Sequence, residues 1–213
     1  MRRIGVTQRV MWLESRKERR DCLDQEWAKV LLELNLAVVP IPNLTRDLEG
    51  LLDACDVSGL LLTGGNDLAC LEGAVDAAPE RDATEFRLLD IAARRGMPVF
   101  GVCRGMQLMV VHGGGDLVRV DEHVTCTHSV AAVPNVPMPL ASRDRVNSYH
   151  GFGVRPEALG ADWVACGLAP DGTVEAACHR FRPQWAVMWH PERGDRDQRD
   201  LALLDALFLA RAA

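Results

Sequence analysis

The sequence has little lysine, few aromatic residues and no long apolar run. Among its 213 residues only Lys17 and Lys29 are lysines, the aromatic fraction is 5%, and the net charge is -6. The negative net charge indicates no basic surface for nucleic acid. No stretch approaches the roughly 18 apolar residues that a membrane-spanning helix needs. We expect no membrane partner either.

The cysteines form no recognisable pairing pattern. There are seven of them, scattered along the chain without a CxxC pair. The odd count and the scattered placement argue against a disulfide framework and favour a reducing cytosol. The first residues, MRRIGVTQRV, lack the apolar run of a signal peptide. We therefore expect a cytoplasmic protein, with one domain over residues 1–213.

The first half of the chain alternates strand and helix patterns. The predicted strands are residues 2–8, 37–41, 58–63 and 97–102. The predicted helices are residues 18–34, 45–55, a segment that Asp82 and Glu85 would cap and Gly96 would end, and 104–112. Apolar runs such as SGLLLT suit strands that are buried on both faces of a parallel sheet. The rhythm predicts a three-layer α/β fold.

The second half has a different pattern. Several short β patterns lie between residues 117 and 190, and a final amphipathic helix is expected over about 196–211. Helix signals between these are sparse. We expect an antiparallel β extension of the same sheet.

One cysteine stands in a distinctive context. Gly101-Val102-Cys103-Arg104-Gly105 lies between a predicted buried strand and a helix. This is the pattern of a nucleophile elbow, with sulfur in place of the serine oxygen. The turn would place the thiol at a helix N-terminus, where the helix dipole stabilises a thiolate. The alternative is a buried structural cysteine, and we interpret the other six cysteines in that way.

A cysteine nucleophile needs a base, and His190 is the best candidate among six histidines. It ends the apolar run WAVMW and is followed by Pro191 and Glu192. A carboxylate two residues on can orient the imidazole. The sequence therefore predicts a Cys103–His190–Glu192 triad, against the alternative of a solvent-facing histidine at a strand end.

A second group of metal-binding residue types is interpreted as structural. His123, Cys126 and His128 lie close in the sequence, but strand alternation would point His123 and Cys126 in opposite directions. No matching second pair stands nearby. We expect no metal site here.

Together these motifs resemble a known family. Gly64-Gly65, GVCRGMQ (101–107) and HPE (190–192) stand in the order and spacing of class I glutamine amidotransferase domains. GVCRGMQ and VNSYH (146–150) are similar to the γ-glutamyl hydrolase branch, peptidase family C26. The resemblance covers residues 4–192. It implies a flavodoxin-like three-layer sandwich with a mostly parallel central sheet and an antiparallel β extension.

The resemblance also implies residue roles. The backbone amides of Gly65 and Arg104 would form the oxyanion hole. Six residues would hold the γ-glutamyl group. They are Gly64, Gln107, Asn147, Ser148, Tyr149 and His150. The implied reaction is hydrolysis of a linear amide C–N bond through a γ-glutamyl thioester, without a cofactor or metal.

The leaving group of the implied substrate is less well defined. Hydrolases of γ-glutamyl-aminobutyrate usually continue the VNSYH motif with His-Gln, whereas Gly151-Phe152 follow here. VTQRV (6–10) and NSYHGFG (147–153) are more similar to the γ-glutamyl-CDP-amidate hydrolases of capsule phosphoramidate biosynthesis. The expected partner is thus a small-molecule γ-glutamyl amide that can be nucleotide-linked.

The N-terminal segment bears on that leaving group. A diphosphate would favour arginines, and four of them cluster there: Arg9, Arg16, Arg19 and Arg20. The alternative for this cluster is a solvated helix start. Trp12 could stack on a base or simply pack.

Other functions stay open at this stage. They are a γ-glutamyl-γ-aminobutyrate hydrolase, a glutaminase subunit that supplies ammonia to a separate synthase, and a non-catalytic binding protein. A cysteine α/β-hydrolase is disfavoured because Glu192 follows His190, and a DJ-1-like protein because Arg104 follows the cysteine. A homo-oligomer stays open as well.

Overall fold

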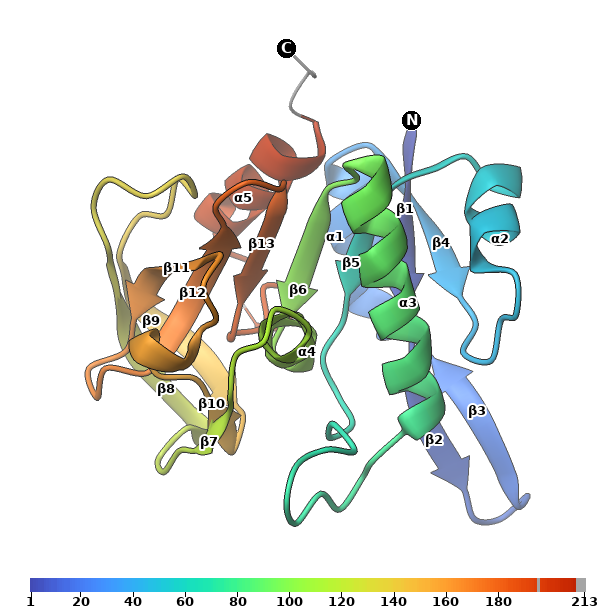
Figure 1. Ribbon diagram of the computed structural model, residues 1–213, viewed down its shortest axis with the longest axis horizontal. Helices are drawn as coiled ribbons and strands as arrows, with labels where there is room; N and C mark the ends of the chain where they lie inside the picture. Colours follow the sequence, from blue (N-terminus) through green and yellow to red (C-terminus); the bar gives the residue numbers. More distant parts are fainter. Residues whose placement is uncertain (195, 210–213) are drawn as a thin grey trace.

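A computed structural model describes residues 1–194 and 196–209 (Figure 1). Its centre is a nine-stranded sheet in the order β4-β1-β5-β6-β13-β12-β11-β8-β9. Five adjacent strands run parallel: β4 (Leu36–Ile41), β1 (Arg2–Thr7), β5 (Val57–Leu62), β6 (Val99–Val102) and β13 (Gln184–Val187). Four antiparallel strands follow: β12 (Val174–His179), β11 (Trp163–Leu168), β8 (Val124–Ala132) and β9 (Arg143–Tyr149).

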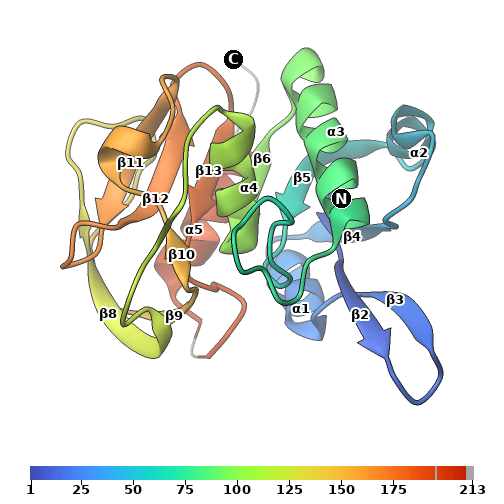
Figure 2. The same cartoon turned by 60° about the horizontal axis from the view of Figure 1, so that its bottom comes forward.

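Helices cover both faces of the parallel part of the sheet (Figures 1 and 2). One face packs against α1 (Gln25–Glu33) and α5 (Gln198–Phe208). The other packs against α2 (Leu48–Ala54), α3 (Pro79–Arg95) and α4 (Arg104–His112). Each face buries its own apolar cluster, so the strands between them are apolar on both sides. The expected three-layer fold with its antiparallel extension is confirmed.

The remaining elements are short. They are β2 (Arg9–Leu13), β3 (Glu18–Cys22), β7 (Val118–Arg119), β10 (Phe152–Gly153) and a 3-10 turn over Pro156–Ala158. Within the described ranges, no helix has both the length and the apolar character needed to cross a membrane.

The prediction of a helix over residues 18–34 was wrong in its first part. Residues Glu18–Cys22 form strand β3, which pairs with β2 in a hairpin that extends away from the sheet (Figure 2). Helix α1 begins only at Gln25, where the Asp24 side chain accepts the amide of Glu26. Trp27, Val30 and Leu31 form the buried face of this helix, but a helical apolar spacing could not reveal the strand pairing that precedes it.

The capping prediction for α3 was also wrong. The helix begins at Pro79, a residue that suits a first turn because it lacks a backbone N–H. Asp82 lies inside the helix, and its carboxylate accepts the amide of Ala69. Gly96 ends the helix in the left-handed conformation, as expected.

Candidate active site

Cys103 occupies a strained turn between β6 and α4. Its φ is 52° and its ψ is -107°, a conformation that costs a non-glycine residue about 1–3 kcal/mol. A Cβ on Gly105 would collide with the carbonyl of Leu62 in β5, so only glycine allows this close approach. The amide of Cys103 donates to the Val187 carbonyl of β13 at 2.8 Å. The turn places the thiol at the start of α4, as a nucleophile elbow does.

Three neighbouring parallel strands deliver the central residues. Gly64 follows β5, Cys103 follows β6, and His190 follows β13. The carboxyl ends of parallel strands meet at one edge of the sheet, where such folds bind ligands. A Cβ on Gly64 would lie 2.6 Å from Cε1 of His190 and 3.5 Å from Cβ of Cys103. The chain therefore has no room for a side chain where the thiol and the imidazole meet.

His190 has the environment of a charged base. Its Nδ1 lies 2.7 Å from Oε1 of Glu192, and both side chains are buried. Burial lowers the pKa of His190, but hydrogen bonds to Cys103 and Glu192 outweigh burial and raise the pKa to about 9. The structure thus brings the three predicted triad residues together.

Asn147 holds the backbone of the base. Its Oδ1 accepts the amide of His190 at 2.8 Å, and its Nδ2 donates to the carbonyls of His190 at 3.0 Å and Arg193 at 3.3 Å. The amide group is therefore committed to the loop that carries His190. This contact was not foreseen for a residue that the resemblance assigned to substrate.

Arg81 organises the loop that contains the Gly-Gly pair. Its buried guanidinium donates to the carbonyls of Thr63 at 2.6 Å and Gly64 at 3.1 Å, and also to the carbonyl of Gly65. Burial lowers the pKa of Arg81 to about 10, which still leaves it charged at neutral pH. Gly65 itself has a φ of 81°, a conformation that favours glycine.

The same network reaches the residue after the nucleophile. Glu85 pairs with Arg81 at 2.9 Å and also with Arg104, which in turn pairs with Asp82. Burial would raise the pKa of Glu85, but Arg104 and Arg81 outweigh burial and hold that pKa below its usual value. The Arg81–Glu85 contact joins residues one turn apart on the same helix. The link from Glu85 to Arg104 on the neighbouring helix was missed.

A cavity of about 260 Å³ opens over Cys103 and His190. Gln107 lines it and donates from Nε2 to the Phe152 carbonyl at 2.8 Å. Tyr149 lines it too, is half exposed, and stands edge-on to the His190 ring at 5.7 Å between centroids.

The other predicted substrate residues are differently engaged. The hydroxyl of Ser148 is buried and donates to the His123 carbonyl at 2.7 Å. His150 borders the cavity, but its Nδ1 binds the Phe152 carbonyl at 3.1 Å and its Nε2 faces Glu175.

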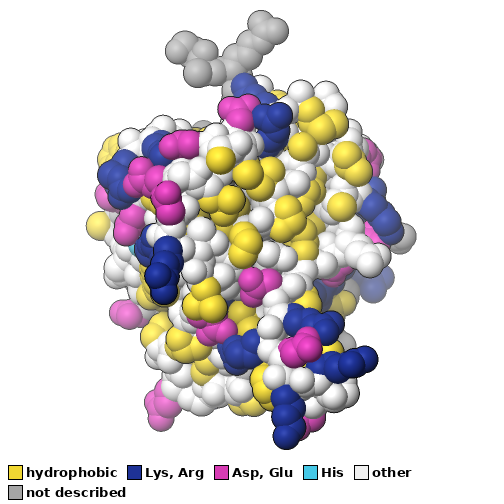
Figure 3. Space-filling view, turned by 90° about the vertical axis from the view of Figure 1, so that its right-hand side faces the viewer, with side chains coloured by type: hydrophobic (Ala, Val, Ile, Leu, Met, Phe, Trp, Pro, Cys, Tyr) yellow, Lys and Arg dark blue, Asp and Glu magenta, His cyan; other side chains and the backbone are white. Residues whose placement is uncertain are grey.

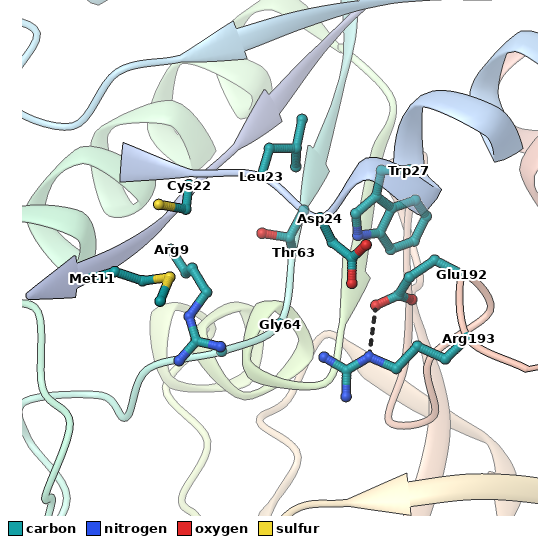
Figure 4. A pocket seen from close by; sticks show the side chains of 11 residues that line it. Arg9, Met11, Cys22, Leu23, Asp24, Trp27, Thr63, Gly64, Glu192 and Arg193 are labelled. Carbon is teal, nitrogen blue, oxygen red and sulfur yellow. Dashed lines mark ion pairs between the residues drawn. The ribbon is translucent and has the colours of Figure 1, made fainter. Parts of the chain in front are cut away.

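A second cavity of about 200 Å³ adjoins the first (Figure 4). Gly64 and Thr63 line it, and Arg9, Gly65 and Arg193 line both cavities. Figure 4 shows the Arg9 and Arg193 guanidinium groups facing the space beside Gly64. Each has an acidic neighbour: Asp76 lies 3.2 Å from Arg9, and Glu192 lies 3.7 Å from Arg193.

Of the four N-terminal arginines, only Arg9 lines these cavities. Arg19 pairs with Glu80 and Arg20 pairs with Glu18. Figure 3 shows basic side chains gathered with acidic ones at the end of the molecule where the β2–β3 hairpin lies. Trp12 is exposed and donates to Glu14, away from both cavities.

The family of the chain follows from its similarity to known proteins. Residues 4–192 match the family model described as Peptidase C26. The chain belongs to this family. A γ-glutamyl-CDP-amidate hydrolase from Campylobacter jejuni is 30% identical over 89% of this chain and 90% of that protein. A γ-glutamyl-γ-aminobutyrate hydrolase from Escherichia coli O157:H7 is 32% identical over 55% of this chain and 54% of that protein. The chain is thus a hydrolase that acts on amide bonds.

Solved structures support the fold. A putative GMP synthase protein from Thermoplasma acidophilum superposes with a TM-score of 0.71 and 20% identity, over 98% of this chain and 92% of that one. A glutamine amidotransferase from Thermotoga maritima superposes with a TM-score of 0.65 and 18% identity, over 91% and 77%. Both share the three-layer architecture seen here.

Proposed function

We propose that this protein hydrolyses a γ-glutamyl amide through a γ-glutamyl thioester on Cys103. The observation that carries the proposal is the elbow cysteine beside His190, whose imidazole is paired with Glu192 at 2.7 Å. A protonated imidazole beside a thiol favours a thiolate, which is the reactive form. Glu192 would hold the imidazole in the tautomer and orientation needed.

In the first step the Cys103 sulfur attacks the γ-carbonyl carbon, and a tetrahedral intermediate forms. His190 then donates its proton to the amide nitrogen as the C–N bond breaks. The amine leaves, and the γ-glutamyl group stays on sulfur as a thioester. In the second step His190 takes a proton from water, the hydroxide attacks the thioester, and glutamate leaves as the thiolate is restored.

The oxyanion of each intermediate would be bound by the backbone amides of Gly65 and Arg104. Two features support this assignment. Arg81 binds the carbonyls of the Gly64-Gly65 loop, and Arg104 is anchored by Glu85. Both peptide units are thereby preorganised, and removing one such donor typically costs about 3–4 kcal/mol in the barrier.

We propose γ-glutamyl-CDP-amidate as the substrate, with the two cavities dividing it. Gln107 and Tyr149 would contact the γ-glutamyl group in the catalytic cavity. Arg9 and Arg193 would contact the diphosphate, because arginine forms strong charge-assisted bonds with phosphate. The similarity to the C. jejuni hydrolase over most of both chains supports this choice.

A γ-glutamyl-γ-aminobutyrate substrate is the second candidate. The same arginines would suit the carboxylate of the aminobutyrate, and the E. coli relative of that activity matches about half of this chain. The Gly151-Phe152 pair at the cavity wall favours the first candidate.

A panel of γ-glutamyl amides separates these candidates. Glutamate release would be measured at equal enzyme concentration from γ-glutamyl-CDP-amidate, γ-glutamyl-aminobutyrate, a γ-glutamyl peptide and glutamine. We expect kcat/KM to be highest for the CDP-amidate. A preference for the aminobutyrate conjugate would contradict the substrate assignment alone. Ammonia release from glutamine that appears only with a second protein chain would instead identify a glutaminase subunit.

A further inference from the structure

Four side chains outside the triad converge in the antiparallel part of the sheet. His123 precedes β8, His128 lies within β8, His150 follows β9, and Glu175 lies in β12. One potential ligand atom from each lies within 4.8 Å of all the others. The side chains are 5%, 12%, 1% and 0% exposed, respectively. The structure thus encloses three imidazoles around one carboxylate.

The atoms that face one another lack hydrogen bonds. Nδ1 of His123, Nε2 of His128, Nε2 of His150 and both carboxylate oxygens of Glu175 are buried without a partner in the described part of the chain. A buried polar group left in this way typically costs about 1–3 kcal/mol. Five such atoms in one place therefore indicate a shared partner at the centre.

The spacing suits a metal ion. Oε1 of Glu175 lies 3.3 Å from Nε2 of His150, 3.5 Å from Nδ1 of His123 and 3.8 Å from Nε2 of His128. Tetrahedral zinc with bonds of about 2.0–2.1 Å separates its ligand atoms by roughly 3.3 Å. The four donors would need only small shifts to reach that geometry.

The outer nitrogens of the rings are held as they are in metal sites. Nδ1 of His128 lies 3.1 Å from the Ser129 carbonyl, and Nδ1 of His150 lies 3.1 Å from the Phe152 carbonyl. Nε2 of His123 lies 3.4 Å from Oδ2 of Asp171. Such contacts place the ring proton outside and leave the inner nitrogen free to bind a metal.

We propose that His123, His128, His150 and Glu175 bind one zinc ion as a closed structural site. The site would join the β8–β9 hairpin to β12, because its ligands lie in these three strands or directly next to them. Apart from β9, the described strands pair with β8 only at Gly167 and Leu168 of β11. His150 also lines the catalytic cavity, so the metal would hold that part of the cavity wall in place.

This proposal departs from the expectation of no metal. The sequence pattern showed His123 and His128 without a second pair nearby, because the other two ligands come from distant strands. Cys126 does not take part; its thiol contacts the Glu122 carbonyl.

Metal content tests the proposal. The protein would be purified from zinc-supplemented culture and analysed by elemental mass spectrometry, with an expected value of about one zinc per chain. Glu175→Gln and His128→Gln should each lose at least about tenfold in bound zinc. His179→Gln, which changes a buried histidine outside the cluster, is the matched control and should keep its zinc. Loss of zinc in the control as well would contradict the assignment.

Two further measurements keep the test decisive if the variants fold poorly. Chelation of the wild-type protein should lower its unfolding midpoint, and added Zn²⁺ but not Mg²⁺ should restore it. Replacement by Co²⁺ should give the visible absorption of tetrahedral coordination. If the wild-type protein binds no zinc and added Zn²⁺ does not change its unfolding midpoint, the four residues form only a hydrogen-bonded network and the proposal is wrong.

The catalytic thiol requires its own control, because Cys103 and His190 could also bind zinc. Cys103→Ala should abolish hydrolysis yet keep its zinc. Loss of zinc in this variant would place the metal at the triad and contradict the proposal. The zinc measurement thus stands apart from the proposed function, whose failure would appear in the hydrolysis assay alone.

Discussion

Glu85 and Arg104 form an ion pair in which neither side chain is more than 1% exposed. Arg104 directly follows the nucleophile, and Glu85 also pairs with Arg81, which binds the Gly64 and Gly65 carbonyls. One buried carboxylate therefore connects the two peptide units proposed to stabilise the oxyanion. Glu85 itself lines neither cavity.

Glu85→Gln should destabilise the protein and slow the reaction. The change leaves two buried guanidinium groups without their shared charge, and breaking a buried ion pair costs about 3–5 kcal/mol. Unfolding by urea would measure the loss. Glu80→Gln is the control because Glu80 pairs with Arg19 near the surface, where such pairs contribute up to about 1 kcal/mol. Equal effects of the two changes would contradict the role assigned to Glu85.

Stability should fall as pH rises toward 9 because of His190. Its pKa is about 9 in the folded protein, against about 6.5 in an unfolded chain. A raised pKa contributes stability that is complete below pH 6.5 and is lost as pH rises through 9. The contribution is on the order of 3 kcal/mol.

The free energy of unfolding at pH values from 6 to 9.5 would test this pH dependence. Cys103→Ser removes the sulfur that helps raise the pKa of His190, so its stability should depend less on pH over that range. An identical pH dependence in wild type and Cys103→Ser would show that the thiol does not interact with the imidazole.

Asn147→Ala should lower kcat far more than it raises KM. The side chain holds the His190 backbone rather than the cavity, and misplacing a catalytic base by a fraction of an ångström costs on the order of 10–100-fold in rate. Steady-state kinetics on the preferred γ-glutamyl amide would separate the two constants. A large rise in KM with unchanged kcat would support direct substrate binding instead.

Arg9→Gln should weaken the binding only of substrates with a negatively charged leaving group. The Arg9 guanidinium lines both cavities, so KM for γ-glutamyl-CDP-amidate should rise on the order of tenfold, since a charged hydrogen bond contributes about 1.5–3 kcal/mol. KM for glutamine should change little. Arg20→Gln, whose arginine pairs with Glu18 in the hairpin, is the control and should leave both values unchanged.

The sequence predicted those features that depend on local pattern. Apolar runs such as 58–63 and 97–102 marked the central strands because both of their faces are buried. Cys103 and His190 were identifiable because glycines surround one and an HPE triplet contains the other. The hairpin at Glu18–Cys22 was missed because its exposed strand carries no apolar alternation.

The sequence pattern could not predict polar contacts between residues far apart in the chain. Glu85 and Arg104 lie on different helices, and no spacing rule joins them. The sequence did contain one indication. Arg81 and Glu85 lie one turn apart on a helix face that also carries Leu88 and Leu89, and this face packs against the core. Charged residues on a core-facing stripe indicate a buried network, although not its partner.

The covalent intermediate offers the most direct test of the central claim. The enzyme would be quenched in acid during turnover of a γ-glutamyl amide, digested, and analysed by mass spectrometry. A glutamyl adduct is predicted on the peptide that contains Cys103, and Cys103→Ala should show neither the adduct nor turnover. An adduct on any of the other six cysteines would contradict the account. Hydrolysis by the Cys103→Ala variant at the rate of the wild-type enzyme would contradict it too.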